Sequence, residues 1–396
     1  MNNGFIDLTW IYSQQPDMVQ LLQNWAGIPS GSDDMEGLSK MATILQEAFA
    51  PLGGSMERLP LAPRTVVDNQ GVSQRLPQGD ALHFHKHPEA PLRIFFGGHM
   101  DTVYSRERQA SVEYLNPGVL KGPGVADMKG GLVIMLTVLQ ALERSSLAGK
   151  IGWEVVINPD EEVGSSGSEP LLRACAKRNH VALLFEPSFP DGALVSVRKG
   201  SATYALVVKG KAAHAGRDFH TGRNAVTALA QIMVDIHALN KRFPGVSINI
   251  GRVSGGEAVN IVPDLAICHF NVRMESTEAL QLFQEALEEI ITKARMEEGI
   301  TIALHSEGAR SPKNWNEKTA RLFFLLETCA KELSIPFETR PTGGVCDGNI
   351  LAESGVPTID TLGVVGGHIH TAEEYCILSS LSERAALTAS LLQALL

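Results

Sequence analysis

Between residues 91 and 188 the sequence alternates short apolar runs that favour buried strands with apolar segments of helical period. The strand-like runs are RIFFGG, GWEVVIN and ALLFEP, and the helical ones are LVIMLTVLQALE and PLLRACAKR. Strands that alternate with helices along the chain are typical of a mainly parallel sheet covered by helices on both faces. We therefore expect a three-layer α/β/α fold around a mixed, mostly parallel sheet.

A different pattern begins at residue 198. Runs of alternating polar and apolar residues flank two helical segments in the order β-α-β-β-α-β, which is that of a ferredoxin-like unit. The 396 residues of the chain also exceed the ~250–300 residues over which a single core usually grows. We expect a discontinuous catalytic domain, residues 1–197 and 310–396, with a smaller α+β domain inserted at residues 198–309.

The net charge of −10 disfavours nucleic acid or an anionic membrane as a partner, because both bind basic surfaces. No apolar stretch approaches the ~20 residues of a membrane helix. The N-terminal residues lack the basic start and apolar run of a secretory signal. Five cysteines without C-x-x-C spacing suit a reducing compartment. We expect a cytoplasmic protein with neither a nucleic-acid nor a membrane partner.

Acidic residues and histidines gather where the predicted strands end, which is where open α/β sheets bind their ligands. The set is His99, Asp101, Asp127, Glu161, Glu162, Glu186, His368 and His370. Taken singly, each has an ordinary alternative as a helix cap, a turn residue or a solvated surface group. Taken together, histidines and several carboxylates without cysteine indicate a divalent-metal site. Their number suits two ions bridged by a carboxylate.

Two nearby groups of polar residues are expected to play no part in that site. His83, His85 and His87 fall in a polar region, residues 68–91, that we predict to be an exposed hairpin with a solvated face. Asp160 precedes the two adjacent glutamates, and we interpret it as a solvated or turn-forming acid.

Seven motifs resemble, in their order and spacing, the di-zinc aminoacylase and glutamate carboxypeptidase family of metallopeptidase clan MH. Within that family the chain is most similar to the carboxypeptidase G branch. The motifs are GGHMDTV, GPGVADMKGG, NPDEEVGSSGS, FEP, KAAHAG, GGEAVNIVP and NVR. The resemblance implies two zinc ions, with cobalt or manganese as substitutes. His99 and Glu186 would be ligands of one ion, and Glu162 and His370 would be ligands of the other. Asp127 would bridge the two ions.

The same resemblance implies groups that assist the metals. Glu161 would be the general base. Asp101 would lie behind His99 and fix its tautomer. The peptide bond between Asp127 and Met128 would be cis. His370 is favoured over His368 as the ligand, because HTAEEY matches the stretch that follows the ligand in the family.

The resemblance further implies a homodimer formed through the inserted domain, which would also act as a lid. His214 would reach into the active site of the second copy and hydrogen-bond the oxyanion. Asn260, Arg273 and Arg310 would hold a carboxylate of the substrate, for which the planar guanidinium of arginine is well suited.

The implied activity is zinc-dependent hydrolysis of an amide bond that releases a C-terminal residue, glutamate in the carboxypeptidase G branch, from a small peptide. An N-acyl-amino-acid deacylase acting on acetylornithine or succinyl-diaminopimelate would use the same centre and stays open as the alternative. A non-catalytic metal-binding relative is disfavoured by the presence of Glu161. Phosphoryl transfer is disfavoured because the chain has no Gly-rich phosphate loop.

Two departures from the family pattern bear on the substrate. Met128 follows the implied bridging aspartate, where the family often has Asp. Residues 343–349 read GGVCDGN in place of a commoner Gly-Thr-Asp run. We expect this segment to line the substrate pocket, and it leaves the exact substrate open.

Overall fold

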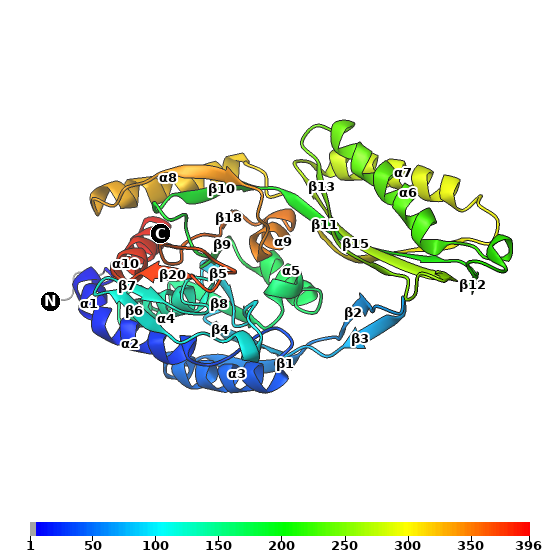
Figure 1. The fold of residues 1–396 in the computed structure, drawn as a ribbon. Coiled ribbons are helices and arrows are strands. Elements are labelled where there is room, and N and C mark those ends of the chain that lie inside the picture. Colours follow the sequence, from blue (N-terminus) through cyan, green and yellow to red (C-terminus); the bar gives the residue numbers. More distant parts are fainter. Residues whose placement is uncertain (1–4) are drawn as a thin grey trace.

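The computed structural model describes residues 5–396, and a six-stranded sheet forms its centre (Figure 1). In spatial order the strands are β1 (Ser55–Pro60), β4 (Asp80–Lys86), β8 (Ile151–Asn158), β5 (Leu92–His99), β9 (Val181–Leu184) and β18 (Thr358–Ile359). Strands β8, β5, β9 and β18 pair in parallel, whereas β1 and β4 add antiparallel pairs at one side. The prediction of a mixed, mostly parallel sheet is confirmed.

Helices cover both faces of this sheet, and alternate residues of β5 show how. Ile94 and Phe96 pack into the core on one face, whereas Phe95 packs into a second core on the other, as the alternation of side chains along a strand requires. The first face is covered by α1 (Leu8–Ser13), α2 (Gln15–Ala26), α3 (Met35–Phe49), α4 (Lys129–Glu143), α8 (Glu317–Glu332) and α10 (Ser379–Ala394). The other face is covered by α5 (Glu169–Arg178) and α9 (Asp347–Glu353). The three layers are therefore α/β/α.

Residues 200–310 form a second unit with its own core. Its elements, in chain order, are β11 (Gly200–Lys209), α6 (Ala225–Ala238), β13 (Ser247–Gly255), β15 (Leu265–Met274), α7 (Thr277–Ala294) and β16 (Thr301–Arg310). The sheet order β13–β15–β11–β16 is that of a ferredoxin-like unit. Helices α6 and α7 cover one face of this sheet (Figure 1). A short pair, β12 (Ala213–His214) and β14 (Ile261–Val262), lies at its far end.

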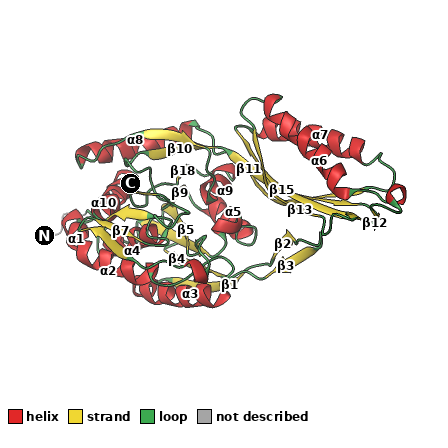
Figure 2. Ribbon diagram, viewed as in Figure 1, coloured by secondary structure: helices red, strands yellow, loops and turns green. Residues whose placement is uncertain are grey.

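A hairpin of the larger unit reaches the other face of the inserted sheet (Figure 2). It consists of β2 (Arg64–Val67) and β3 (Ser73–Leu76). Val67 is buried against Val207 and Ile267 of the inserted sheet. Its backbone N–H donates a hydrogen bond to Glu307 Oε1 at 3.1 Å. The hairpin thus connects the two units at a point away from the chain crossings near residues 200 and 310.

The expected exposed hairpin over residues 68–91 is only partly correct, because residues 80–86 form strand β4 inside the central sheet. His83 is 8% exposed, and its Nε2 lies 2.8 Å from Glu154 Oε1. The prediction that His83 is solvated was wrong. Its polar neighbours suggested a surface strand, but β4 is flanked by β1 and β8, and Glu154 of β8 supplies a buried partner for the ring.

Shorter elements connect these units. The remaining strands are β10 (Leu194–Arg198) with β17 (Thr339–Thr342), and the four-stranded set β19 (Gly366–Gly367), β20 (Tyr375–Ile377), β7 (Val119–Lys121) and β6 (Glu113–Asn116). The 3-10 turns are η1 (Ala50–Leu52), η2 (Arg106–Arg108), η3 (Glu161–Val163), η4 (Phe219–Thr221) and η5 (Leu239–Lys241). Within residues 5–396, every helix is too short or too polar to span a bilayer.

Candidate metal centre

The acids and histidines that follow the predicted strands meet at the carboxyl edge of the central sheet. His99 is the last residue of β5, Glu161 and Glu162 occupy η3 just after β8, and Glu186 follows β9. Asp127 lies just before α4, and its peptide bond to Met128 is cis, as the resemblance implies. His370 comes from the loop between β19 and β20 and has a left-handed φ of 64°, which is uncommon for a residue other than glycine.

The carboxylate of Asp127 lies between two sets of ligand atoms. Its Oδ1 is 3.2 Å from His99 Nε2, which is itself 3.7 Å from Glu186 Oε2. Its Oδ2 is 3.3 Å from His370 Nε2, which is 3.2 Å from Glu162 Oε2. Each oxygen of Asp127 therefore faces one histidine and one glutamate, which is the arrangement that a bridging carboxylate needs.

The chemistry of this donor set fits divalent cations. All five groups offer nitrogen or oxygen, and His99, Asp127 and Glu162 place ligand atoms within 4.8 Å of one another. Burial raises the pKa of Glu162 to about 7 and that of Glu186 to about 8, since ionised carboxylates in this cluster lack solvent. Burial opposes a charge on His99, but Glu186 and Asp101 outweigh it and raise the pKa of that ring. Bound cations would offset the crowding of these carboxylates.

Asp101 connects the two halves of the site. Its buried carboxylate lies 3.3 Å from His99 Nδ1 and accepts the backbone N–H groups of Glu161 at 3.2 Å and Glu162 at 3.1 Å. The hydroxyl of Ser32 donates to it at 2.7 Å. Neighbouring residues of a regular strand point to opposite faces. The 3-10 turn, held by Asp101, instead lets both glutamates serve one site.

Arg310 contacts Glu161, the predicted general base. Its Nη1 donates to Glu161 Oε1 at 2.8 Å, and its Nη2 donates to Ser165 Oγ at 2.6 Å and to Asp347 Oδ1 at 3.2 Å. Burial is the main cause that raises the pKa of Glu161, and Arg310 opposes it. The carboxylate of Glu161 is thus held beside the metal ligands by a group that is not one of them.

A cavity of about 420 Å³ opens beside the ligands, and we call it the arginine pocket. Gly344, Val345 and Cys346 of the altered segment line it, beside the metal ligands. Two cations line it as well. Arg198 is paired with Asp360 at 2.8 Å. Arg273 has a buried Nη1 that finds no hydrogen-bond partner within residues 5–396, so the guanidinium is available to an anionic ligand.

His214 and Asn260 lie elsewhere. His214 ends β12 and Asn260 directly precedes β14, at the far end of the inserted unit, where the backbone N–H of Ala215 donates to the carbonyl of Asn260 at 2.9 Å (Figure 1). Neither residue lines the arginine pocket of its own chain. The structure therefore brings nine of the eleven predicted site residues together and leaves these two apart.

Sequence reasoning missed Glu374, whose carboxylate is 1% exposed. It accepts the backbone N–H groups of Gly124 at 3.1 Å, Ala126 at 2.9 Å and Asp127 at 2.9 Å. The hydroxyl of Tyr104 donates to it at 2.8 Å. Glu374 therefore fixes the loop that carries Asp127. The only signal in the sequence was its place in the HTAEEY stretch just after His370.

Of the two interpretations of Asp160, a solvated or a turn-forming acid, the solvated one is wrong, because the residue is 1% exposed. It accepts the backbone N–H groups of Gly167 at 2.9 Å and Ser168 at 3.2 Å, together with the Ser168 hydroxyl at 2.6 Å. Burial raises its pKa to about 6. Asp160 closes the loop that follows η3, and in this way it supports the turn that carries the paired glutamates.

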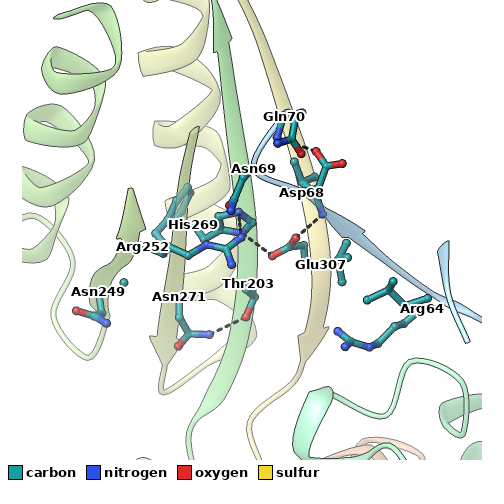
Figure 3. A pocket seen from close by; sticks show the side chains of 15 residues that line it. Arg64, Asp68, Asn69, Gln70, Thr203, Asn249, Arg252, His269, Asn271 and Glu307 are labelled. Atoms are coloured by element: carbon teal, nitrogen blue, oxygen red, sulfur yellow. Dashed lines mark hydrogen bonds and ion pairs between the residues drawn. The ribbon is translucent and has the colours of Figure 1, made fainter. Parts of the chain in front are cut away.

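Two polar clusters lie away from the metal ligands. A cavity of about 660 Å³ is lined by the β2–β3 hairpin and the inserted sheet, and His269 at this cavity connects Arg252 to Glu307 (Figure 3). On the central sheet, the Glu154 carboxylate contacts Cys175 as well as His83. Arg178 donates to that carboxylate at 2.5 Å, so a side chain of the protein already balances its charge.

Comparisons with known proteins agree with this geometry. The model of the family described as Peptidase family M20/M25/M40 matches residues 95–394 of the chain. Carboxypeptidase G2 of Pseudomonas sp. (strain RS-16) is 28% identical over 384 residues, covering 96% of this chain and 89% of its own. Succinyl-diaminopimelate desuccinylase of Hahella chejuensis (strain KCTC 2396) is 26% identical over 345 residues, covering 81% of this chain and 87% of its own. A solved dinuclear metal-binding M20 peptidase from Bacillus subtilis is 15% identical, with a TM-score of 0.66 over 96% of this chain and 97% of its own.

Proposed function

Since the chain belongs to peptidase family M20/M25/M40, we propose that it is a metal-dependent hydrolase of the amide bond in a small peptide or an N-acylated amino acid. The observation that carries this proposal is the position of Asp127. Its two carboxylate oxygens face separate histidine–glutamate pairs, while Glu161 stands free of both pairs. The metal pair is proposed to be zinc, with cobalt or manganese as substitutes.

The proposed ligands divide as the distances suggest. His99 and Glu186 would hold one ion, Glu162 and His370 would hold the other, and Asp127 would bridge them. When bound, such a pair supplies a water of lowered pKa and polarises the substrate carbonyl. Asp101 keeps the ring of His99 oriented from its Nδ1 side.

The remaining chemistry falls to side chains. Glu161 accepts the proton of the attacking water and returns it to the nitrogen of the leaving amine. Arg310 keeps the Glu161 carboxylate in position. Arg273 receives a carboxylate of the amine part of the substrate, because it lines the arginine pocket and its Nη1 has no hydrogen-bond partner within residues 5–396.

We further propose that the active enzyme is a homodimer formed through the inserted unit. His214 ends β12, and the carbonyl of Asn260, just before β14, accepts the backbone N–H of the next residue, Ala215. The two residues would therefore enter the site of the second copy together. In that site His214 would donate a hydrogen bond to the oxyanion, and Asn260 would assist in holding the substrate carboxylate.

Two substrate classes are supported by the relatives. A carboxypeptidase releasing a C-terminal glutamate is our first proposal, since one relative is named carboxypeptidase G2. An N-acyl-amino-acid deacylase is the second, since another relative is named succinyl-diaminopimelate desuccinylase. Both reactions need the same centre and one carboxylate on the amine side.

The test combines metal analysis with a substrate screen. Protein reconstituted with zinc is assayed with folyl-glutamate and with N-acetyl amino acids, and the products are identified. We expect about two metal ions per chain and hydrolysis that a chelator abolishes and added zinc restores. A chain that binds two ions but hydrolyses no amide in either series would contradict the proposal.

A further inference from the structure

Glu162 separates two cavities. On one side is the arginine pocket, which Glu162 lines together with Arg273. On the other side is a cavity of about 550 Å³ that Glu162 also lines, and we call it the acidic pocket. Its further lining residues come from three segments of the larger unit, 31–34, 102–107 and 163. A substrate whose scissile bond lies at the metal centre can therefore extend into one cavity on each side.

The two cavities differ in the charge that they offer to a ligand. The acidic pocket is lined by the carboxylates of Asp33, Asp34 and Glu107, in addition to Glu162. Its one lining cation is Arg106.

The charge of Arg106 is already balanced. Its Nε and Nη2 donate to the two carboxylate oxygens of Asp34, both at 2.9 Å, and its Nη1 donates to Glu36 at 3.0 Å. Asp33 contacts Arg64 at 2.5 Å, so that nearby cation is paired as well. Within residues 5–396, the acidic pocket therefore presents no unpaired guanidinium or ammonium to a ligand.

Thr102 adds a neutral polar residue to the lining of the acidic pocket. Thr102 lines it and is 1% exposed, and its hydroxyl has no hydrogen-bond partner in the described part of the chain. A buried hydroxyl without a partner is costly, so a polar ligand atom is the expected complement. The pocket is thus suited to a ligand that is polar and not anionic.

We propose that the acidic pocket receives the acyl part of the substrate and selects acyl groups that carry an ammonium or no charge over those that carry a carboxylate. The inference rests on the proposed function, which places the amine part at Arg273. The favoured class is a short peptide with a free N-terminal ammonium, followed by neutral N-acyl amino acids. N-succinyl amino acids are disfavoured, because their carboxylate would meet Glu107 without a free cation to pair with, whereas Asp33 and Asp34 are already paired with Arg64 and Arg106.

The experiment uses three substrates that share one amino acid on the amine side and differ only in the acyl group: glycyl, acetyl and succinyl. With the zinc-loaded enzyme we expect kcat/KM for the succinyl compound to be at least tenfold below that for the acetyl compound. We expect the glycyl compound to equal or exceed the acetyl one. Added salt should narrow these differences, because charges at an open pocket are screened.

A charge reversal tests the same idea on the protein. Glu107→Lys changes an exposed side chain of the pocket and should raise the succinyl-to-acetyl ratio of kcat/KM several-fold. Glu89→Lys, at an exposed position that lines none of the cavities near the metal ligands, is the matched control and should leave the ratio unchanged.

The outcomes separate this inference from the function beneath it. If neither the three amides nor folyl-glutamate is hydrolysed, the proposed function fails and the inference fails with it. If folyl-glutamate alone is hydrolysed, the function stands and the inference is overturned. If the succinyl compound is hydrolysed as well as the acetyl one, the function stands and the inference is overturned. An equal shift of the succinyl-to-acetyl ratio of kcat/KM in Glu89→Lys and Glu107→Lys would also overturn the inference. The effect would then come from the net charge of the protein and not from the acidic pocket.

Discussion

In the larger unit the polar side chains of the metal centre contact one another, whereas Arg273 and His214 of the inserted unit make few contacts. Asp101 alone accepts hydrogen bonds from Ser32, Glu161 and Glu162. In the inserted unit, Arg273 keeps a buried Nη1 without a partner within residues 5–396, and the exposed ring of His214 contacts only nearby backbone N–H groups. We infer that the larger unit carries a preorganised centre, and that substrate and a second copy complete the site from the inserted unit.

The strongest test of the preorganised half is Glu161→Gln. The amide cannot accept the proton of the attacking water, so kcat should fall by about 10²–10⁴-fold, the usual contribution of a general base. The metal content measured by mass spectrometry should stay at the wild-type value. Glu162→Gln is the matched control at the adjacent position and should lower metal affinity instead. Wild-type turnover in Glu161→Gln would remove the base assignment.

The corresponding test of the inserted half is His214→Ala. Loss of one oxyanion donor costs about 10²–10³-fold in kcat in other enzymes, and we expect a loss of that size here. Because His214 is proposed to act across the dimer, mixing this variant with Glu161→Gln should rebuild one intact site in each mixed dimer. Recovery of about a quarter of wild-type activity is expected from random pairing. No recovery on mixing would show that His214 does not serve a second copy.

A smaller effect is expected at Glu374, which fixes the Asp127 loop without touching a metal. In Glu374→Gln one carboxylate oxygen becomes an NH₂ group that cannot accept the backbone N–H groups. Supporting groups of this kind change metal affinity by about 10–100-fold, and we expect a loss in that range. Competition with a chelating dye measures it, and the absorption of the cobalt-loaded protein should shift. If the metal affinity and the absorption spectrum of the cobalt-loaded protein were unchanged, Glu374 would not position the metal ligand Asp127.

The smallest effect is expected where the two units touch. Val67→Ala trims a side chain that is 3% exposed between the hairpin and the inserted sheet. We expect the free energy of unfolding to fall by about 1 kcal/mol, as for other small truncations of buried side chains. Denaturant titration checks this against Thr65→Ala, an exposed position of the same strand. An equal change in both variants would mean that Val67 contributes no packing between the units.

The sequence allowed the metal centre to be predicted because its residues obey a positional rule. His99 ends β5, and Glu162 and Glu186 come shortly after β8 and β9. These strands are mostly apolar, and such strands end at one edge of a parallel sheet. The inserted ferredoxin-like sheet was predictable for a similar reason, since its strands alternate polar and apolar residues.

Other residues escaped prediction because their partners are distant along the chain or belong to the backbone. Glu374 binds N–H groups near residue 126, and the sequence does not show which N–H groups lack partners. Asp160 binds the N–H of Gly167 and Ser168 around a turn whose shape depends on tertiary packing. His83 was misjudged because a polar residue in a short strand reads as exposed until its neighbour, here Glu154, is known.

The place where the inserted unit joins the rest has a consequence for engineering. Ser201, near its start, and Arg310, at its end, are register partners on β11 and β16. Paired residues of antiparallel strands have Cα atoms about 5 Å apart. If the unit were excised, a short linker would therefore join the two ends that remain in the larger unit into one continuous chain. The unit is therefore suited to transfer as a cassette between relatives. A transplanted cassette would have to arrive with a hairpin that covers Val207 and Ile267, or with polar replacements at those positions.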